Sequence, residues 1–306
     1  MAEFDYIVVG AGSAGCVMAN RLSEDPDASV LLLEAGGKDD NIWIHIPVGY
    51  IKTMQDPGVN WLFETEPEEY TYNRSIPVLR GKVLGGSSSI NGMLYVRGQS
   101  QDYDTWAQLG NRGWSFDDVL PYFKKSENNV DRPTELHGVG GLLQVEDLSE
   151  TYPILDAFID AAEEAGYPKN PDYNGTNQEG FGYYQVTQKG GRRYSVSRAF
   201  LDPIRGRANL KVETDAFARD VILEGKKAVG INYTVHGFQR AARARKEVIL
   251  CAGAIQSPQI LELSGVGQPE LLREHGIEVR HKLAGVGENH QDHYISRMAW
   301  KVKQPV

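Results

Sequence analysis

The sequence has 306 residues, 41% of them hydrophobic and 24% charged, and this composition is typical of a globular protein of about two domains. Its formal net charge of −9 argues against a broad nucleic-acid or anionic-membrane surface, because both require clustered Lys and Arg. No segment approaches the ~20 apolar residues of a membrane span, and residues 1–5 lack the character of a signal peptide, so we expect a cytoplasmic protein, with peripheral docking at the inner membrane left open.

The first 34 residues predict a strand, a helix and a second strand. Residues 6–9 and 29–33 are short apolar runs, and residues 14–23 have helical spacing. The turn between the first strand and the helix reads GAGSAG, and the second strand ends at Glu34. This arrangement is typical of a dinucleotide-binding unit.

Each glycine of the GAGSAG turn has a separate expected role. Gly10 permits the tight turn, Gly12 lets the backbone approach a pyrophosphate, and Gly15 lets the helix pack closely on the strand. The helix N-terminus then faces the phosphate charge, and Glu34 stands where an acid binds the adenosine ribose. We therefore expect an adenine dinucleotide as ligand, although this stretch does not distinguish FAD from NAD.

Two later stretches are rich in loop residues. Residues 36–76 form a long irregular segment, which we interpret either as a lid over the cofactor or as a packed connection. Residues 80–98 combine glycines, serines and an asparagine, a composition that supplies backbone N–H groups able to surround an extended polar ligand. An ordinary turn capped by Ser and Asn is the alternative for this second stretch.

The remaining elements are predicted from hydrophobic spacing and capping residues. Ser115 and Asp118 have the spacing of a capping box, and Ser257 with Pro258 is typical of a helix start. The predicted helices lie at residues 116–127, 153–165, 258–263 and 268–275. The predicted strands lie at residues 142–145, 183–187, 210–214, 219–223, 228–235 and 247–251, and those within 210–235 are expected to form an antiparallel meander.

Three groups of residues are expected to have structural roles only. Cys16 and Cys251 are expected as small buried side chains rather than a disulfide, and His137 as a turn residue rather than a catalyst. The HQDH run at residues 290–293 offers a metal site as an alternative. Neighbouring residues of a loop point in different directions and no other cluster completes the site, so we expect no metal.

Taken together, these motifs resemble the glucose–methanol–choline (GMC) oxidoreductase family, and within it the choline and alcohol dehydrogenase branch. The resemblance rests on GAGSAG with Glu34, on GKVLGGSSSINGMLYVRG at residues 81–98 and on GAIQSPQILELSGVG at residues 253–267. It implies an α/β fold with a Rossmann-like FAD-binding domain at residues 1–141 and 209–306, and a lid at about 36–76. An inserted, incomplete α+β substrate domain would start at residues 142–208.

The resemblance also implies a set of FAD-binding residues. The pyrophosphate is assigned to Gly10, Gly12, Ser13, Ala14 and Gly15, and the adenosine ribose to Glu34, with Ala35 beside it. Along the flavin and its ribityl chain the resemblance places Val83, Gly85, Gly86, Ser87, Asn91, Gly92, Met93 and Leu94. The adenine end is completed by Ala218, Ala252 and Gly253.

The activity implied by the resemblance is oxidation of a primary alcohol by hydride transfer to flavin N5, with oxygen or a quinone as electron acceptor. Ile90 stands where some family members carry a histidine bonded to the flavin, so we expect non-covalent FAD. Family members are considerably longer, and their catalytic histidine pair is expected beyond Val306, so no catalytic residue is named. A catalytically inactive FAD-binding fragment, or lyase or photodecarboxylase chemistry on the same scaffold, are the alternatives.

Overall fold

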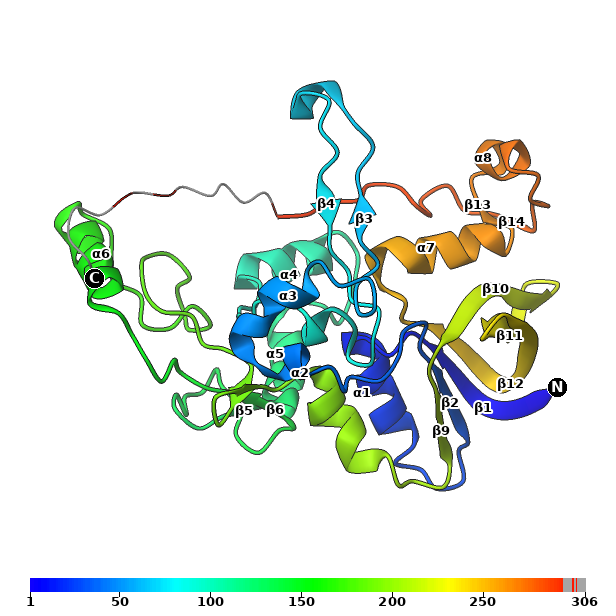
Figure 1. Ribbon diagram of the computed structural model, residues 1–306, viewed down its shortest axis with the longest axis horizontal. Helices are drawn as coiled ribbons and strands as arrows, with labels where there is room; N and C mark the ends of the chain where they lie inside the picture. The colour runs from blue at the N-terminus through cyan, green and yellow to red at the C-terminus, as the bar shows by residue number, and fades with distance from the viewer. Residues whose placement is uncertain (294–298, 300, 302–306) are drawn as a thin grey trace. The chain divides into compact units, whose positions relative to one another are not determined.

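The main sheet lies in the first part of the fold and is drawn as arrows in Figure 1, and two of its inner strands are largely buried and apolar. The computed structural model describes residues 1–293, 299 and 301. β1 (Ala2–Val9) runs parallel to β2 (Val30–Leu33) on one side and to β12 (Phe238–Leu250) on the other. All of β2 is buried, as is typical of a parallel strand covered on both faces. With α1 (Ser13–Leu22) between β1 and β2, the predicted strand, helix and strand are confirmed.

The sheet has six strands in the order β10-β11-β12-β1-β2-β9. β10 (Ala216–Glu224), β11 (Lys227–Val235) and β12 form an antiparallel meander, whereas β9 (Leu210–Glu213) pairs parallel with β2 at the opposite edge. The expectation that residues 210–214 belong to the meander was therefore wrong. Local sequence favours an extended conformation, but it does not select the strand's partner.

The chain divides into two compact units, one made of Met1–Asn91 with Ser195–Asp292 and the other of Gly92–Tyr194. The further helices of the first unit are α2 (Ile42–His45), α3 (Tyr50–Thr53), α7 (Gly253–Leu263) and α8 (Pro269–Glu274). Its short strand pairs are β3 (Phe63–Glu64) with β4 (Pro77–Val78), and β13 (Val266–Gly267) with β14 (His281–Lys282).

The second unit has the helices α4 (Ser100–Gln108), α5 (Phe116–Ser126) and α6 (Pro153–Glu164). Its strand pairs are β5 (Glu127–Asn129) with β6 (Leu143–Val145), and β7 (Gln188–Lys189) with β8 (Arg192–Arg193).

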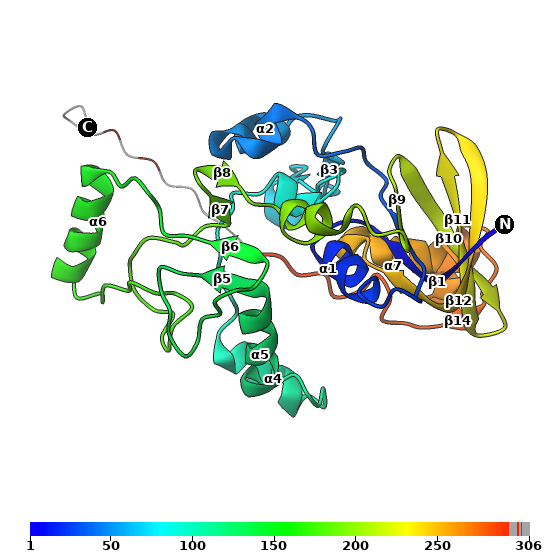
Figure 2. The same cartoon turned by 90° about the horizontal axis from the view of Figure 1, so that it is seen from below.

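The units of the structure change at residues 91–92 and 194–195, whereas the predicted domains change at 141 and 208. Within the second unit α4 contacts α5, and α5 leads directly into β5, which pairs with β6 (Figure 2). These contacts group residues 92–141 with the segment that follows them. The predicted domain boundaries remain a prediction about how the whole protein is organised.

Helix ends follow capping chemistry in one case and depart from the prediction in another. At α5, the Ser115 Oγ accepts a hydrogen bond from the Asp118 N–H at 3.3 Å and the Asp118 carboxylate accepts one from the Ser115 N–H at 3.2 Å, so the predicted capping box is confirmed. At α7, the predicted start at Ser257 was wrong, because the helix begins at Gly253 and Pro258 lies inside it. Pro258 is the sixth residue of α7, where it cannot donate the helical hydrogen bond to the carbonyl four residues before it.

One predicted strand is absent from the described part of the second unit. Residues 183–187 contribute only isolated bridges, in which Val186 pairs with Leu94 and Glu146. Val186 exchanges two backbone hydrogen bonds with Glu146, and the bridge to Leu94 is made by its neighbours Gln185 and Thr187, so no continuous ladder forms. Across the described residues, no helix is both long enough and apolar enough to cross a bilayer.

A buried polar network holds the second unit together around His137. The side chain is fully buried, with Nδ1 2.9 Å from the Glu127 carboxylate and Nε2 3.0 Å from the Asp172 carboxylate. The Glu127 carboxylate also accepts a 2.6 Å hydrogen bond from the Arg97 guanidinium. Burial alone lowers the pKa of His137, but the hydrogen bonds with Glu127 and Asp172 outweigh it and raise the pKa above its usual value. His137 therefore has the contacts of a structural cation.

Candidate functional site

The glycine-rich turn lies at the carboxyl end of β1, where β1 passes into α1. The Gly10 N–H donates to the Leu33 carbonyl at 2.8 Å, and its φ of +97° is a conformation that favours glycine. This bond joins the ends of the two central parallel strands. In open α/β sheets such a point, beyond the carboxyl ends of the strands, is where ligands bind.

Gly12 and Gly15 differ in what a side chain would meet. A Cβ on Gly15 would stand 1.8 Å from the Gly10 carbonyl oxygen, so this glycine is required by the packing of α1 on the turn. A Cβ on Gly12 would have Gly86 Cα, at 3.9 Å, as its nearest neighbour. Protein contacts therefore do not explain the glycine at position 12. The space beside it fits a ligand that approaches the backbone.

Glu34 is buried at the end of β2, with 5% of its surface exposed. One carboxylate oxygen accepts a hydrogen bond from the Ala11 N–H at 2.8 Å, and the other accepts one from the Gly36 N–H at 2.9 Å. Burial raises the pKa of Glu34 to about 7, although these two N–H groups lower it. Each oxygen keeps a second lone pair for a hydroxyl donor.

The second glycine-rich stretch packs on the first through backbone contacts. The Gly85 N–H donates to the Ala11 carbonyl at 2.8 Å, and a Cβ on Gly86 would stand 2.7 Å from Gly12 Cα. The Ser87 Oγ accepts from the Gly81 N–H at 3.1 Å and fixes the turn. Residues 80–87 thus form a wall beside the GAGSAG turn.

The third motif supplies a helix N-terminus. α7 begins at Gly253 directly after β12, and no side chain caps its first turn. The first N–H groups of a helix are not used in helical hydrogen bonds and carry partial positive charge. The sequence-based start at Ser257 placed this helix end too late, because Ala252 and Gly253 themselves form it.

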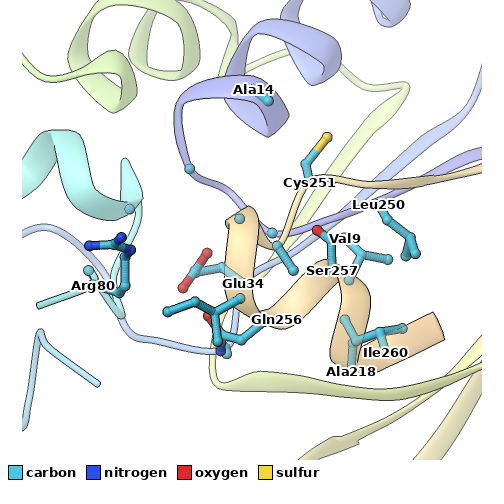
Figure 3. Close-up of a pocket in the computed structure, with 18 of the residues that line it drawn as sticks. Val9, Ala14, Glu34, Arg80, Ala218, Leu250, Cys251, Gln256, Ser257 and Ile260 are labelled. Carbon is cyan, nitrogen blue, oxygen red and sulfur yellow. The ribbon is translucent and has the colours of Figure 1, made fainter. Parts of the chain in front are cut away.

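These three motifs surround a cavity of about 480 Å³ within the first unit (Figure 3). In the figure Arg80 lies on one side, Ala218 and Ile260 lie on the other, and Glu34 and Gln256 lie between them. The predicted residues that line the cavity are Gly10, Gly12, Ser13, Ala14, Glu34, Ala35, Gly86, Ser87, Ala218, Ala252 and Gly253. Both helix N-termini and the buried carboxylate therefore meet at one cavity.

Other predicted residues do not line this cavity. Gly15 packs against Gly10. Val83 is fully buried in an apolar cluster with Ile44, Val59 and Ile90. Gly85 and Asn91 lie at the two ends of the turn that holds Ser87. Gly92, Met93 and Leu94 belong to the second unit. Their assignment to the flavin and its ribityl chain remains a prediction.

The cavity also contains residues that the sequence reasoning missed. The most prominent are Trp61, Arg80, Phe217 and Gln256. Trp61 lies in the segment interpreted as a lid, and Arg80 is the first residue of the glycine–serine stretch, so the sequence position of each already indicated a place near the ligand. Gln256 lies in the GAIQSPQILELSGVG motif at residues 253–267, so it also had a signal, whereas nothing local marked Phe217.

The described residues contain no group of three or more His, Cys, Asp or Glu side chains able to hold a metal ion. Cys16 is fully buried and its thiol donates to the Ala11 carbonyl at 3.1 Å, while burial raises its pKa to about 12. Cys251 is partly buried, and neither cysteine forms a disulfide.

Comparison with known proteins gives a consistent result. Residues 4–295 match the sequence profile of a family described as GMC oxidoreductase. The oxygen-dependent choline dehydrogenase of Chromohalobacter salexigens is 50% identical over 99% of this chain and 55% of its own length. The alcohol dehydrogenase [acceptor] of Pseudomonas putida is 47% identical over 95% of this chain and 53% of its own length.

A solved structure gives the same answer for the fold. The crystal structure of pyridoxine 4-oxidase from Mesorbium loti matches with a TM-score of 0.88 and 33% identity, over 91% of this chain and 55% of that chain. In these comparisons the chain spans about half the length of the curated relatives it matches.

Proposed function

The chain belongs to the GMC oxidoreductase family, and from this premise we propose that it holds FAD for the oxidation of a primary alcohol. GMC oxidoreductases are FAD-binding flavoproteins, which settles the choice between FAD and NAD. The observation that carries the proposal is the cavity of the first unit, where the glycine turn, Glu34 and the start of α7 meet. The adenosine and pyrophosphate of FAD are assigned to this cavity.

The residues present fit this part of FAD. Gly12 leaves space beside the backbone for a pyrophosphate, and α1 and α7 both direct an N-terminus toward the cavity. The Glu34 carboxylate, held by the Ala11 and Gly36 N–H groups, accepts hydrogen bonds from ribose hydroxyls. These contacts bind and orient the dinucleotide, and the first unit supplies all of them.

The reaction is assigned by the relatives' names and by the cofactor. When bound, the flavin supplies a hydride acceptor for the alcohol carbon. Choline and other primary alcohols are the proposed substrates, and oxygen or a quinone is the proposed electron acceptor. No histidine is among the residues that line the cavity in the described part of the chain. Because this cavity is assigned to the adenosine end of FAD, away from the alcohol carbon, we assign proton removal from the hydroxyl to a histidine outside it.

A second proposal is that this chain alone binds FAD without turnover. It is favoured by the span of the chain, which is about half that of its relatives. The flavin would then be bound, but its reduction by an alcohol would lack a base.

The visible spectrum of the purified chain tests both proposals. Oxidised flavin bands at about 380 and 450 nm are expected, and denaturation should release the colour, because Ile90 offers no atom for a covalent bond to flavin. Anaerobic addition of choline, or of 1-butanol as a second primary alcohol, then distinguishes the two. Bleaching supports an active alcohol oxidoreductase, persistent colour supports the FAD-binding portion alone, and a colourless folded protein contradicts FAD binding by this chain.

A further inference from the structure

Two aromatic side chains that the sequence reasoning missed form one wall of the cavity. Trp61 and Phe217 both line it, and their ring centroids lie 6.1 Å apart with the ring planes tilted by 60°. Phe217 lies near the start of the edge strand β10 and is 43% exposed, so part of its ring is apolar surface that no protein atom covers. An aromatic surface of this kind favours a planar ligand ring.

The Trp61 ring is held in place from outside the cavity. Phe63 stacks on it with a centroid distance of 5.6 Å, and the Lys82 ammonium lies 4.8 Å from the ring centroid. The backbone N–H of Trp61 donates to the Arg80 carbonyl at 2.9 Å, which ties this part of the main chain to the wall formed by residues 80–87. A ring fixed in this way is preorganised for binding, because ordering it costs little when the ligand arrives.

The position of the wall identifies which part of the cofactor it contacts. The Ala216 N–H donates to the Glu34 carbonyl at 2.8 Å, so Phe217 follows directly after the residue that is paired with Glu34. Glu34 is the proposed ribose ligand, and in FAD the adenine is the ring attached to that ribose. The ring beside this aromatic wall is therefore the adenine rather than the flavin.

We propose that Trp61 and Phe217 form the adenine-binding wall of the FAD site. This inference rests on the proposed function, because it assumes that the cavity holds the adenosine end of FAD. It adds two residues that bind the base through their side chains, whereas the resemblance assigned only small residues, among them Ala218, to this end.

Titration of the apoprotein with FAD and with ADP tests the proposal, because ADP carries the adenine but no flavin. Phe217→Ala and Trp61→Ala are each expected to raise the Kd for both ligands about tenfold, the usual loss when a base loses an aromatic partner. Phe217→Tyr keeps a ring and should restore the wild-type Kd. Phe238→Ala is the matched control, since Phe238 is a 73% exposed phenylalanine of β12 that does not line the cavity.

The outcomes separate the inference from the function on which it rests. Equal losses for FAD and ADP in the two alanine variants, with none in the control, support the adenine wall. Unchanged Kd values, or a loss for FAD without a loss for ADP, overturn the wall and leave FAD binding intact. If the folded wild-type chain binds no FAD, the proposed function fails instead. Circular dichroism of each variant shows whether it is folded, and Phe217→Tyr provides a second comparison if Phe217→Ala is not.

Discussion

The contrast between Gly12 and Gly15 gives the sharpest prediction about the site. A methyl added at position 12 has Gly86 Cα as its nearest protein neighbour, at 3.9 Å, which is ordinary van der Waals contact. The free energy of unfolding of Gly12→Ala should therefore differ from that of the wild type by less than about 1 kcal/mol. The same methyl occupies the space assigned to the pyrophosphate. We expect the Kd for FAD to rise about 10- to 100-fold, as when one or two hydrogen bonds to a charged group are lost.

Gly15→Ala is the matched change with the opposite expectation. Its methyl would stand 1.8 Å from the Gly10 carbonyl oxygen, so α1 must move away from the turn. Overpacking of this kind costs about 1–3 kcal/mol and occasionally more, and a contact this short belongs at the upper end. Gly15→Ala should thus lower the stability of the apoprotein itself.

Urea denaturation of the apoproteins, followed by far-UV circular dichroism, measures the first quantity, and FAD titration measures the second. The expected pattern is a normal denaturation midpoint with weak FAD binding for Gly12→Ala, and a lowered midpoint for Gly15→Ala. Equal destabilisation by both changes would refute the reasoning, because Gly12 would then serve packing. So would wild-type FAD affinity in Gly12→Ala, because the space beside Gly12 would not belong to the ligand.

Three further predictions concern charge. The pKa of Glu34 is raised from 4.5 to about 7, so its contribution to the stability of the apoprotein is complete below pH 4.5 and is lost by about pH 7. The loss amounts to about 3 kcal/mol of unfolding free energy. Urea denaturation at several pH values should show this loss in the wild type and not in Glu34→Gln. The pKa of His137 is also raised, so its ion pairs with Glu127 and Asp172 should stabilise the second unit below the usual histidine pKa, and this stability should be lost as the pH rises. If His137→Gln loses as much stability as the wild type when the pH is raised, the prediction is contradicted. Arg80 is the one Lys or Arg among the described residues that line the cavity. Arg80→Gln should therefore raise the Kd for FAD about tenfold at low salt and less at 1 M salt. Arg74 is exposed, and an equal loss of affinity in the control Arg74→Gln would argue against a specific phosphate contact.

The position of the glycine turn and of Glu34 could be predicted from the sequence because its signals are local. The spacing of the three glycines, two apolar strands and a terminal acid lie within 34 residues, and the structure places Gly10, Gly12 and Glu34 at one cavity. The capping box of α5 was equally local, since Ser115 and Asp118 satisfy each other's backbone N–H groups. Such features depend on neighbours in the sequence and are readable without the fold.

The features that were missed depend on distant parts of the chain. Residues 210–214 were recognised as a strand, but nothing in them specified β2 as the partner. Ser257 and Pro258 imitate a helix start, and the true start at Gly253 follows from the end of β12 at Leu250. The aromatic wall could not be predicted, because Trp61 and Phe217 are brought together only after β10 has joined the sheet.

The strand order has a consequence for how the protein is made. β1 needs β12 as its second neighbour, yet between Leu33 at the end of β2 and Phe238 at the start of β12 the ribosome adds about 200 residues. At ~5–20 residues per second this takes roughly 10 to 40 s, during which one edge of β1 is unpaired. The nascent chain therefore carries an exposed apolar edge that other chains or chaperones can contact. FAD can be captured only after β12 and the first turn of α7 have been synthesised, so cofactor loading is a late event in biosynthesis.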